Sequence, residues 1–209
     1  MTRFIASLAL AVAALAPGAA HAQEVTLSSL LTRFSELPGM EARFEEEKQI
    51  ALLAVPVRSE GRIWFAPGPA RLMRRVTSPE PSAALIANGQ LRMRSGERTE
   101  ELSIRDNPVL HGFVESFRAV LAGDQETLER FYEAELTAGD AEGWEIVLRP
   151  RNDALARFVR EIRMRGHGVV IESMDMIEVS GDRTTTRFSD VNTQRRYSRA
   201  DAQRIFRIP

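Results

Sequence analysis

The sequence has no cysteine and only three histidines among its 209 residues. A chain without cysteine can form no disulfide, no thiolate nucleophile, no cysteine metal site and no lipid-modified N-terminal cysteine. Charge of one sign is not in excess either, because 28 basic and 29 acidic side chains give a formal net charge of −1. No overall attraction to nucleic acid or to an anionic membrane is therefore expected, and partner choice must depend on local patches.

The motifs of common enzymes and metal sites are also missing. No nucleophile elbow, P-loop or H-E-x-x-H pattern occurs, and His111 and His167 stand in settings typical of surface residues. In the acidic run Glu45–Glu47, alternation places Glu46 on the opposite face from its neighbours, which favours a solvated edge strand over a glycosidase carboxylate pair. We predict no catalytic site, no metal and no cofactor.

Long apolar runs are limited to the N-terminus and stay shorter than the about 20 residues of a membrane span. Residues 1–22 have the form of a secretory signal peptide, with Arg3, an apolar run from Phe4 to Ala16, and Ala20-His21-Ala22 before Gln23. Removal of this leader takes away one charged residue. We expect residues 23–209 to form one exported domain, because 44% hydrophobic and 27% charged residues are ordinary for a soluble domain.

Alternation of apolar and polar residues dominates the stretch from Gly61 to Ser95. Pro67-Gly68-Pro69 and Ser78-Pro79-Glu80-Pro81 interrupt it, and Asn88-Gly89 is typical of a tight hairpin turn. This pattern predicts a curved antiparallel meander.

Helices and strands are expected on both sides of this meander. Helical spacing of apolar residues predicts helices at 27–37, from Asp106-Asn107-Pro108 to Gly123, from Asp124 onward, and at 200–206. Alternation predicts strands at 40–44, 50–57, 98–104, 133–137, 144–149, 158–165, 169–179 and 184–188. The resulting fold class is α+β, mainly β: an incomplete antiparallel β-barrel whose concave face is covered by helices.

Several short motifs carry a family resemblance. The stretch 61–95 contains a glycine-led strand, a proline followed by a basic residue and an extended run, a Ser-Pro pair, and an apolar strand closed by Asn-Gly. The other motifs are Phe44-Glu45-Glu46, the strand 144–150, and the segments 181–184 and 188–192. In this order they resemble the LolA-type outer-membrane lipoprotein carriers over nearly the whole chain after the leader. The segment 107–124 is similar to LolA-related proteins that accompany polyene or acyltransferase pathways. Glu46 stands where the better-known carriers have glutamine.

This resemblance implies a periplasmic, monomeric carrier. Its cargo would be lipoprotein acyl chains or a lipid-like product, received from an inner-membrane exporter and passed to an outer-membrane acceptor. In that family an arginine holds lid helices over the empty cavity by hydrogen bonds, and Arg74 or Arg71 is the match. By alternation Arg74 shares a face with Leu72 and Val76, while Arg71, Met73 and Arg75 share the other.

Candidate ligand-binding residues are apolar side chains of the strands and of the helix expected to act as a lid. Methionine fills irregular apolar sites and accepts variable partners, although ordinary core packing is the alternative for each one. The candidates for the cavity or lid are Trp64, Met73, Arg74, Leu91, Met93, Phe113, Phe117, Met174 and Met176.

Two alternatives to a carrier stay open. A regulatory lipid sensor could use the same fold, although such sensors normally carry an added C-terminal domain. An enzyme would require a carboxylate pair facing the cavity.

The signal-peptide form of residues 1–22 leads to a first testable prediction. Protein recovered from the periplasm should begin at Gln23, because Ala20-His21-Ala22 supplies the small residues that signal peptidase requires. Intact-mass measurement tests this. A retained leader would contradict it.

Overall fold

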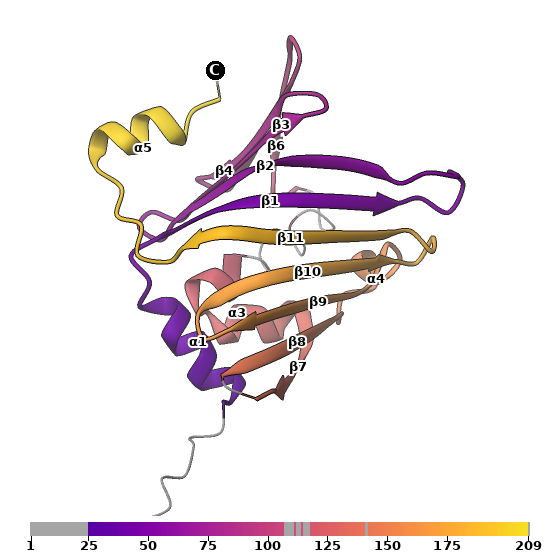
Figure 1. Cartoon of the computed structure of the whole chain (residues 1–209), viewed down its shortest axis with the longest axis vertical. Coiled ribbons are helices and arrows are strands. Elements are labelled where there is room, and N and C mark those ends of the chain that lie inside the picture. Colours follow the sequence, from indigo (N-terminus) through magenta and orange to yellow (C-terminus); the bar gives the residue numbers. More distant parts are fainter. Residues whose placement is uncertain (1–24, 107–110, 112–113, 115–117, 141, 209) are drawn as a thin grey trace, which may run out of the picture.

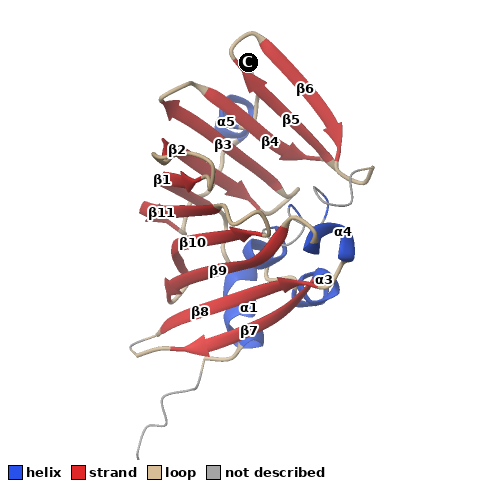
Figure 2. Ribbon diagram, turned by 90° about the vertical axis from the view of Figure 1, so that its right-hand side faces the viewer, coloured by secondary structure: helices blue, strands red, loops and turns tan. Residues whose placement is uncertain are grey.

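The computed structural model describes residues 25–106, 111, 114, 118–140 and 142–208. Its central feature is one antiparallel sheet in the order β6-β5-β4-β3-β2-β1-β11-β10-β9-β8-β7 (Figures 1 and 2). The strands are β1 (Met40–Gln49), β2 (Val57–Ala66), β3 (Arg71–Ser78), β4 (Ser82–Ala87), β5 (Gln90–Ser95), β6 (Arg98–Ser103), β7 (Tyr132–Ala138), β8 (Gly143–Pro150), β9 (Val159–His167), β10 (Val170–Glu178) and β11 (Arg183–Asn192). The predicted mainly β, open and curved architecture is confirmed.

Two meanders make up this sheet. Strands β1 to β6 follow one another outward to one edge, and β7 to β11 run inward from the other edge. They meet where β1 pairs with β11, for example Phe44 with Phe188 and Glu46 with Thr186. Consecutive strands are thus neighbours in the sheet except β6 and β7, which lie at its opposite edges.

The turns follow the sequence signals with one exception. Asn88 and Gly89 have φ angles of 52° and 74° and join β4 to β5, as expected. The strand predicted at 50–57 is wrong, because β1 extends to Gln49 and residues 50–56 form the turn into β2. Periodicity could not place this boundary, because β1 remains a strand through Glu45–Gln49, whose side chains are all polar.

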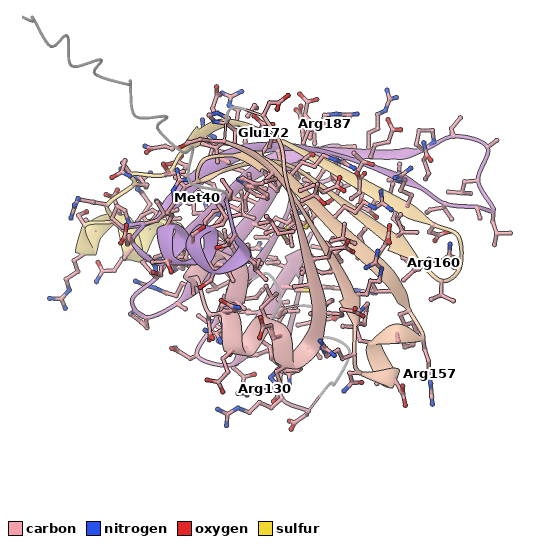
Figure 3. The ribbon with its side chains drawn as sticks, turned by 90° about the horizontal axis from the view of Figure 1, so that it is seen from below. Met40, Arg130, Arg157, Arg160, Glu172 and Arg187 are labelled. Atoms are coloured by element: carbon pink, nitrogen blue, oxygen red, sulfur yellow. The ribbon has the colours of Figure 1, made fainter. Side chains whose placement is uncertain are left out.

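One face of the sheet curves around helices (Figure 3). Helix α1 (Leu27–Ser35) begins at a capping box formed by Thr26 and Ser29, and Leu30, Leu31 and Phe34 of its apolar stripe are buried in the main core. Helices α3 (Gln125–Phe131) and α4 (Asp153–Ala156) add Leu128 and Leu155 to that core. None of the helices in the described ranges is long and apolar enough to cross a membrane.

The C-terminal helix α5 (Arg199–Ile205) lies on the face of the sheet opposite to the concave one. Its Ile205, with Phe206, packs on Trp64, Met73 and Leu85, whose strand positions alternate with those of the concave-face residues. Arg75 fixes this contact by donating to the backbone carbonyls of Arg204, Ile205 and Arg207. Ser198 and Asp201 form a capping box at the start of α5.

Gly61 marks a close approach inside the sheet. A Cβ there would clash with the backbone oxygen of Arg75 on β3 and lie 2.9 Å from the Phe44 ring. The ladder between β2 and β3 shifts register at the same place, between Glu60 and Gly61. Glycine is therefore required for β3 and the Phe44 ring to pack this closely.

Replacing Gly61 with alanine should lower the free energy of unfolding by about 1–3 kcal/mol, because the added methyl overpacks a closed site. Urea denaturation measures this loss. Gly68→Ala is the matched control: nothing lies within 4 Å of its added Cβ, and its effect should stay below about 1 kcal/mol. Equal effects at the two positions would contradict the close approach.

Candidate functional site

An apolar cavity of about 290 Å³ lies on the concave face. Strands from both meanders supply its walls, and Val114 closes one side of it. The lining residues are Phe44, Glu46, Ile63, Leu72, Arg74, Ala84, Ile86, Leu91, Met93, Val114, Met174, Thr186 and Phe188. Its volume is near the lower end of the roughly 300–1,000 Å³ typical of ligand pockets.

The charged and polar side chains of this lining form one connected group. Arg74 donates from Nη2 to Glu46 Oε1 at 2.9 Å, and Thr186 Oγ1 donates to Glu46 Oε2 at 3.2 Å. The guanidinium of Arg74 also lies 4.2 Å from the centre of the Phe44 ring. Both charges are partly withdrawn from water, with side-chain exposures of 32% for Arg74 and 27% for Glu46. The cavity therefore has one polar corner and otherwise apolar walls.

The register of the sheet brings these residues together. Arg74 on β3 pairs with Ile63 on β2, and Phe44 on β1 pairs with Gly61 on β2. Because Gly61 has no side chain, the Phe44 ring fits against β2 beside the guanidinium. The arginine can then bridge two strands, stacking on an aromatic face while pairing with a carboxylate.

The structure separates the predicted site residues into four groups. Arg74, Leu91, Met93 and Met174 line the cavity. Trp64 and Met73 lie on the opposite face under α5, and Met176 packs against the main core. Phe113 and Phe117, the lid candidates, lie outside the described residues.

The partner of Arg74 differs from the family-based expectation. The resemblance implied hydrogen bonds to lid helices, but the acceptor among the described residues is Glu46, at the position where the better-known carriers have glutamine. A different arginine, Arg75, binds helix-end carbonyls, and it does so on the opposite face. Arg75 is therefore bound to the C-terminal segment rather than extended into solvent.

Phe44, Thr186 and Phe188 were not among the candidates. Alternation with polar neighbours predicts on which side of its strand each of these side chains lies. Nothing in the local sequence indicates that β1 and β11 are adjacent. The run Glu45–Glu47 was expected at a solvated edge, and this is wrong because β1 pairs on both sides, with β2 and β11. Among the described residues, no cluster of three or more histidine or acidic side chains could hold a metal ion.

Comparison with known families agrees with this geometry. The model of the family described as "outer membrane lipoprotein carrier protein LolA-like" matches residues 19–206. The chain belongs to this LolA-like family. The resemblance drawn from the sequence motifs is thereby confirmed, while comparison with curated proteins found no match.

Solved structures are similar to this LolA-like chain in fold. A chain of the MucA/MucB complex of Pseudomonas aeruginosa matches with a TM-score of 0.50 and 13% identity, over 83% of this chain and 59% of that one. A LolA superfamily protein from Nitrosomonas europaea gives 0.44 and 12%, over 88% and 98%. A DUF1329 family protein from Desulfovibrio piger gives 0.48 and 7%, over 87% and 94%.

The coupling between Arg74 and Glu46 can be measured by a double-mutant cycle with Arg74→Leu and Glu46→Leu. We expect a coupling energy of about 1 kcal/mol in the free energy of unfolding. This is the upper part of the range for exposed pairs, because the Arg74–Glu46 pair is partly shielded from solvent. Urea denaturation of the four proteins gives the value.

The pair Arg92–Glu101 is the matched control, since its side chains are 48% and 47% exposed. Its coupling should be about 0.5 kcal/mol or less. A coupling for Arg74–Glu46 no larger than that of the control would show that the cavity gives the pair no protection from solvent.

Proposed function

We propose that this LolA-like protein is a periplasmic carrier. It binds acyl chains of a lipoprotein or lipid-like product in the concave cavity and moves them from the inner toward the outer membrane. The observation that carries the proposal is the cavity itself, apolar on every wall except the Arg74–Glu46–Thr186 corner. The family membership supports the same function.

The physical need for such a carrier follows from acyl-chain hydration. Each CH₂ exposed to water costs about 0.8 kcal/mol, so a chain of ordinary length does not leave a membrane unaided. Leu72, Ile86, Leu91 and the flexible side chains of Met93 and Met174 offer it an apolar site. Methionine accommodates chains of differing shape, which favours moderate affinity and release to a better acceptor.

The polar corner suits the boundary between acyl chain and headgroup. Arg74 has hydrogen-bond donors that can bind ester or phosphate oxygens once its bond to Glu46 opens. Glu46 and Phe44 hold the guanidinium in place in this structure. Cargo binding then exchanges one set of acceptors for another.

A regulatory lipid sensor is the alternative function. Such a protein would bind the same apolar ligand and respond by contacting a membrane-bound partner, so ligand binding alone does not separate the two. Transfer does: a carrier delivers bound acyl chains to acceptor vesicles or an acceptor protein, whereas a sensor retains them.

Met93→Glu tests the cavity directly. A carboxylate introduced into this apolar wall must be desolvated when a chain binds, so affinity for a fluorescent fatty-acid probe should fall about tenfold or more. Fluorescence titration of the soluble protein measures this. Met93 is only partly buried, so the variant should fold.

Thr99→Glu adds the same charge to the other face of the same hairpin, because Thr99 pairs with Arg94 and is exposed. Probe affinity should remain that of the unchanged protein. If both variants bind like the original protein, the acyl chain does not occupy this cavity.

A further inference from the structure

Exposed large apolar side chains gather at one end of the sheet. Leu52 is 94% exposed and Val55 72%, and both lie in the turn between β1 and β2. The others at this end are Leu53, Val57, Phe158 and Val179. We refer to these six residues as the apolar rim.

Three adjacent segments form the rim. The turn between β1 and β2 projects beyond the sheet next to the turn between β10 and β11 (Figure 1), and Phe158, which follows α4, adjoins that second turn at Val179. Hydrogen bonds link them: the backbone N–H of Ala51 donates to Asp182 Oδ1 at 2.9 Å, and that of Val179 donates to the Phe158 carbonyl at 2.9 Å. The rim is therefore one surface, held in place although its side chains are in water.

This concentration is unusual for a soluble surface. Single exposed apolar residues are common, but a contiguous group marks a site for another protein or a membrane. Two arginines at this end can contact lipid phosphates. Arg157 follows α4 and Arg160 lies on β9 (Figure 3), and neither has an ion pair within the described ranges.

The carboxylates closest to the projecting turn are already engaged. Glu47 pairs with Arg58 and Glu178 with Lys48, and Asp182 accepts the hydrogen bond from Ala51. Asp182 keeps its charge despite this hydrogen bond, and neither it nor the exposed Asp153 of α4 has an ion pair within the described ranges. The rim thus combines apolar side chains with arginines that can reach lipid phosphates, the combination by which interfacial segments bind anionic lipid surfaces.

We propose that the apolar rim docks this protein on an anionic phospholipid surface. Leu52, Leu53 and Val55 enter the headgroup and acyl boundary, while Arg157 and Arg160 contact lipid phosphates. This inference rests on the proposed carrier function for its purpose but concerns a surface separate from the cavity lining.

Docking at this end also orients the cavity. Glu46, in its polar corner, precedes Ile50 by four positions on β1, about 13 Å at the usual rise of a strand. An acyl chain leaving the bilayer at the rim would then meet the Arg74–Glu46 corner. The rim places donor or acceptor membrane beside the site that takes the chain.

Vesicle co-sedimentation of the full exported protein tests the proposal. It should bind vesicles of phosphatidylglycerol and phosphatidylethanolamine more tightly than vesicles of phosphatidylcholine, and added salt should weaken the binding. Leu52→Glu combined with Val55→Glu should lower the partition coefficient about tenfold or more, because both side chains lose apolar burial in the bilayer. Arg157→Glu with Arg160→Glu should lower it about tenfold or more and remove the preference for anionic lipid.

The matched control is Leu102→Glu, at an exposed leucine on the edge strand β6, outside the rim. It should leave vesicle binding unchanged. Failure of the original protein to bind anionic vesicles, or equal binding by the rim variants, would overturn the proposal. Self-association that disappears in the Leu52 variant would instead assign the rim to a second copy of the chain.

Cargo binding is measured separately on the same variants. The Leu52→Glu, Val55→Glu protein should bind the soluble fatty-acid probe like the original protein, since neither residue lines the cavity. Loss of vesicle binding with retained probe binding supports the rim. Vesicle binding without any probe binding would instead contradict the cavity proposal and leave the rim proposal standing.

Discussion

Pairing between the first and last strands is the constraint on which the rest of this structure depends. β1 and β11 are distant in sequence, and their ladder joins two meanders that otherwise share no strand pairing. The same ladder sets Phe44 against Phe188 and Glu46 against Thr186. The cavity therefore requires both ends of the chain to be in place.

A strict division between the two faces follows from this one sheet. Side chains that alternate along β2 and β3 go either to the cavity, as Ile63 and Leu72 do, or to the surface under α5, as Trp64 and Met73 do. The arginines obey the same rule: Arg74 stacks on Phe44 inside, and Arg75 binds the carbonyls of α5 outside. Adjacent residues of one chemical type thus serve different halves of the molecule.

Local sequence signals predicted the pieces better than their assembly. The alternation of 61–95, the Asn88-Gly89 turn and the helical spacing of apolar residues at 27–37 and 200–206 each depend on nearby residues, and each predicted its element. The Glu46–Arg74 pair lies on strands separated by β2, so no local pattern indicated it. For the same reason Trp64 and Met73 were candidates for the cavity, although both lie on the opposite face under α5.

The open edge of the sheet gives the cavity an adjustable wall. Most of the main core lies with α1, α3 and strands β7 to β11, whereas Leu91 and Met93 belong to a smaller cluster around Ile104 and Val114. In Figure 2, β5 and β6 lie at the far end of the sheet from α1 and α3. Because β6 has a neighbour on one side only, the wall formed by β4 and β5 can bend outward while the main core stays packed. The strands that determine how much the cavity can hold are thus different from the strands that pack most of the main core, although all belong to one sheet.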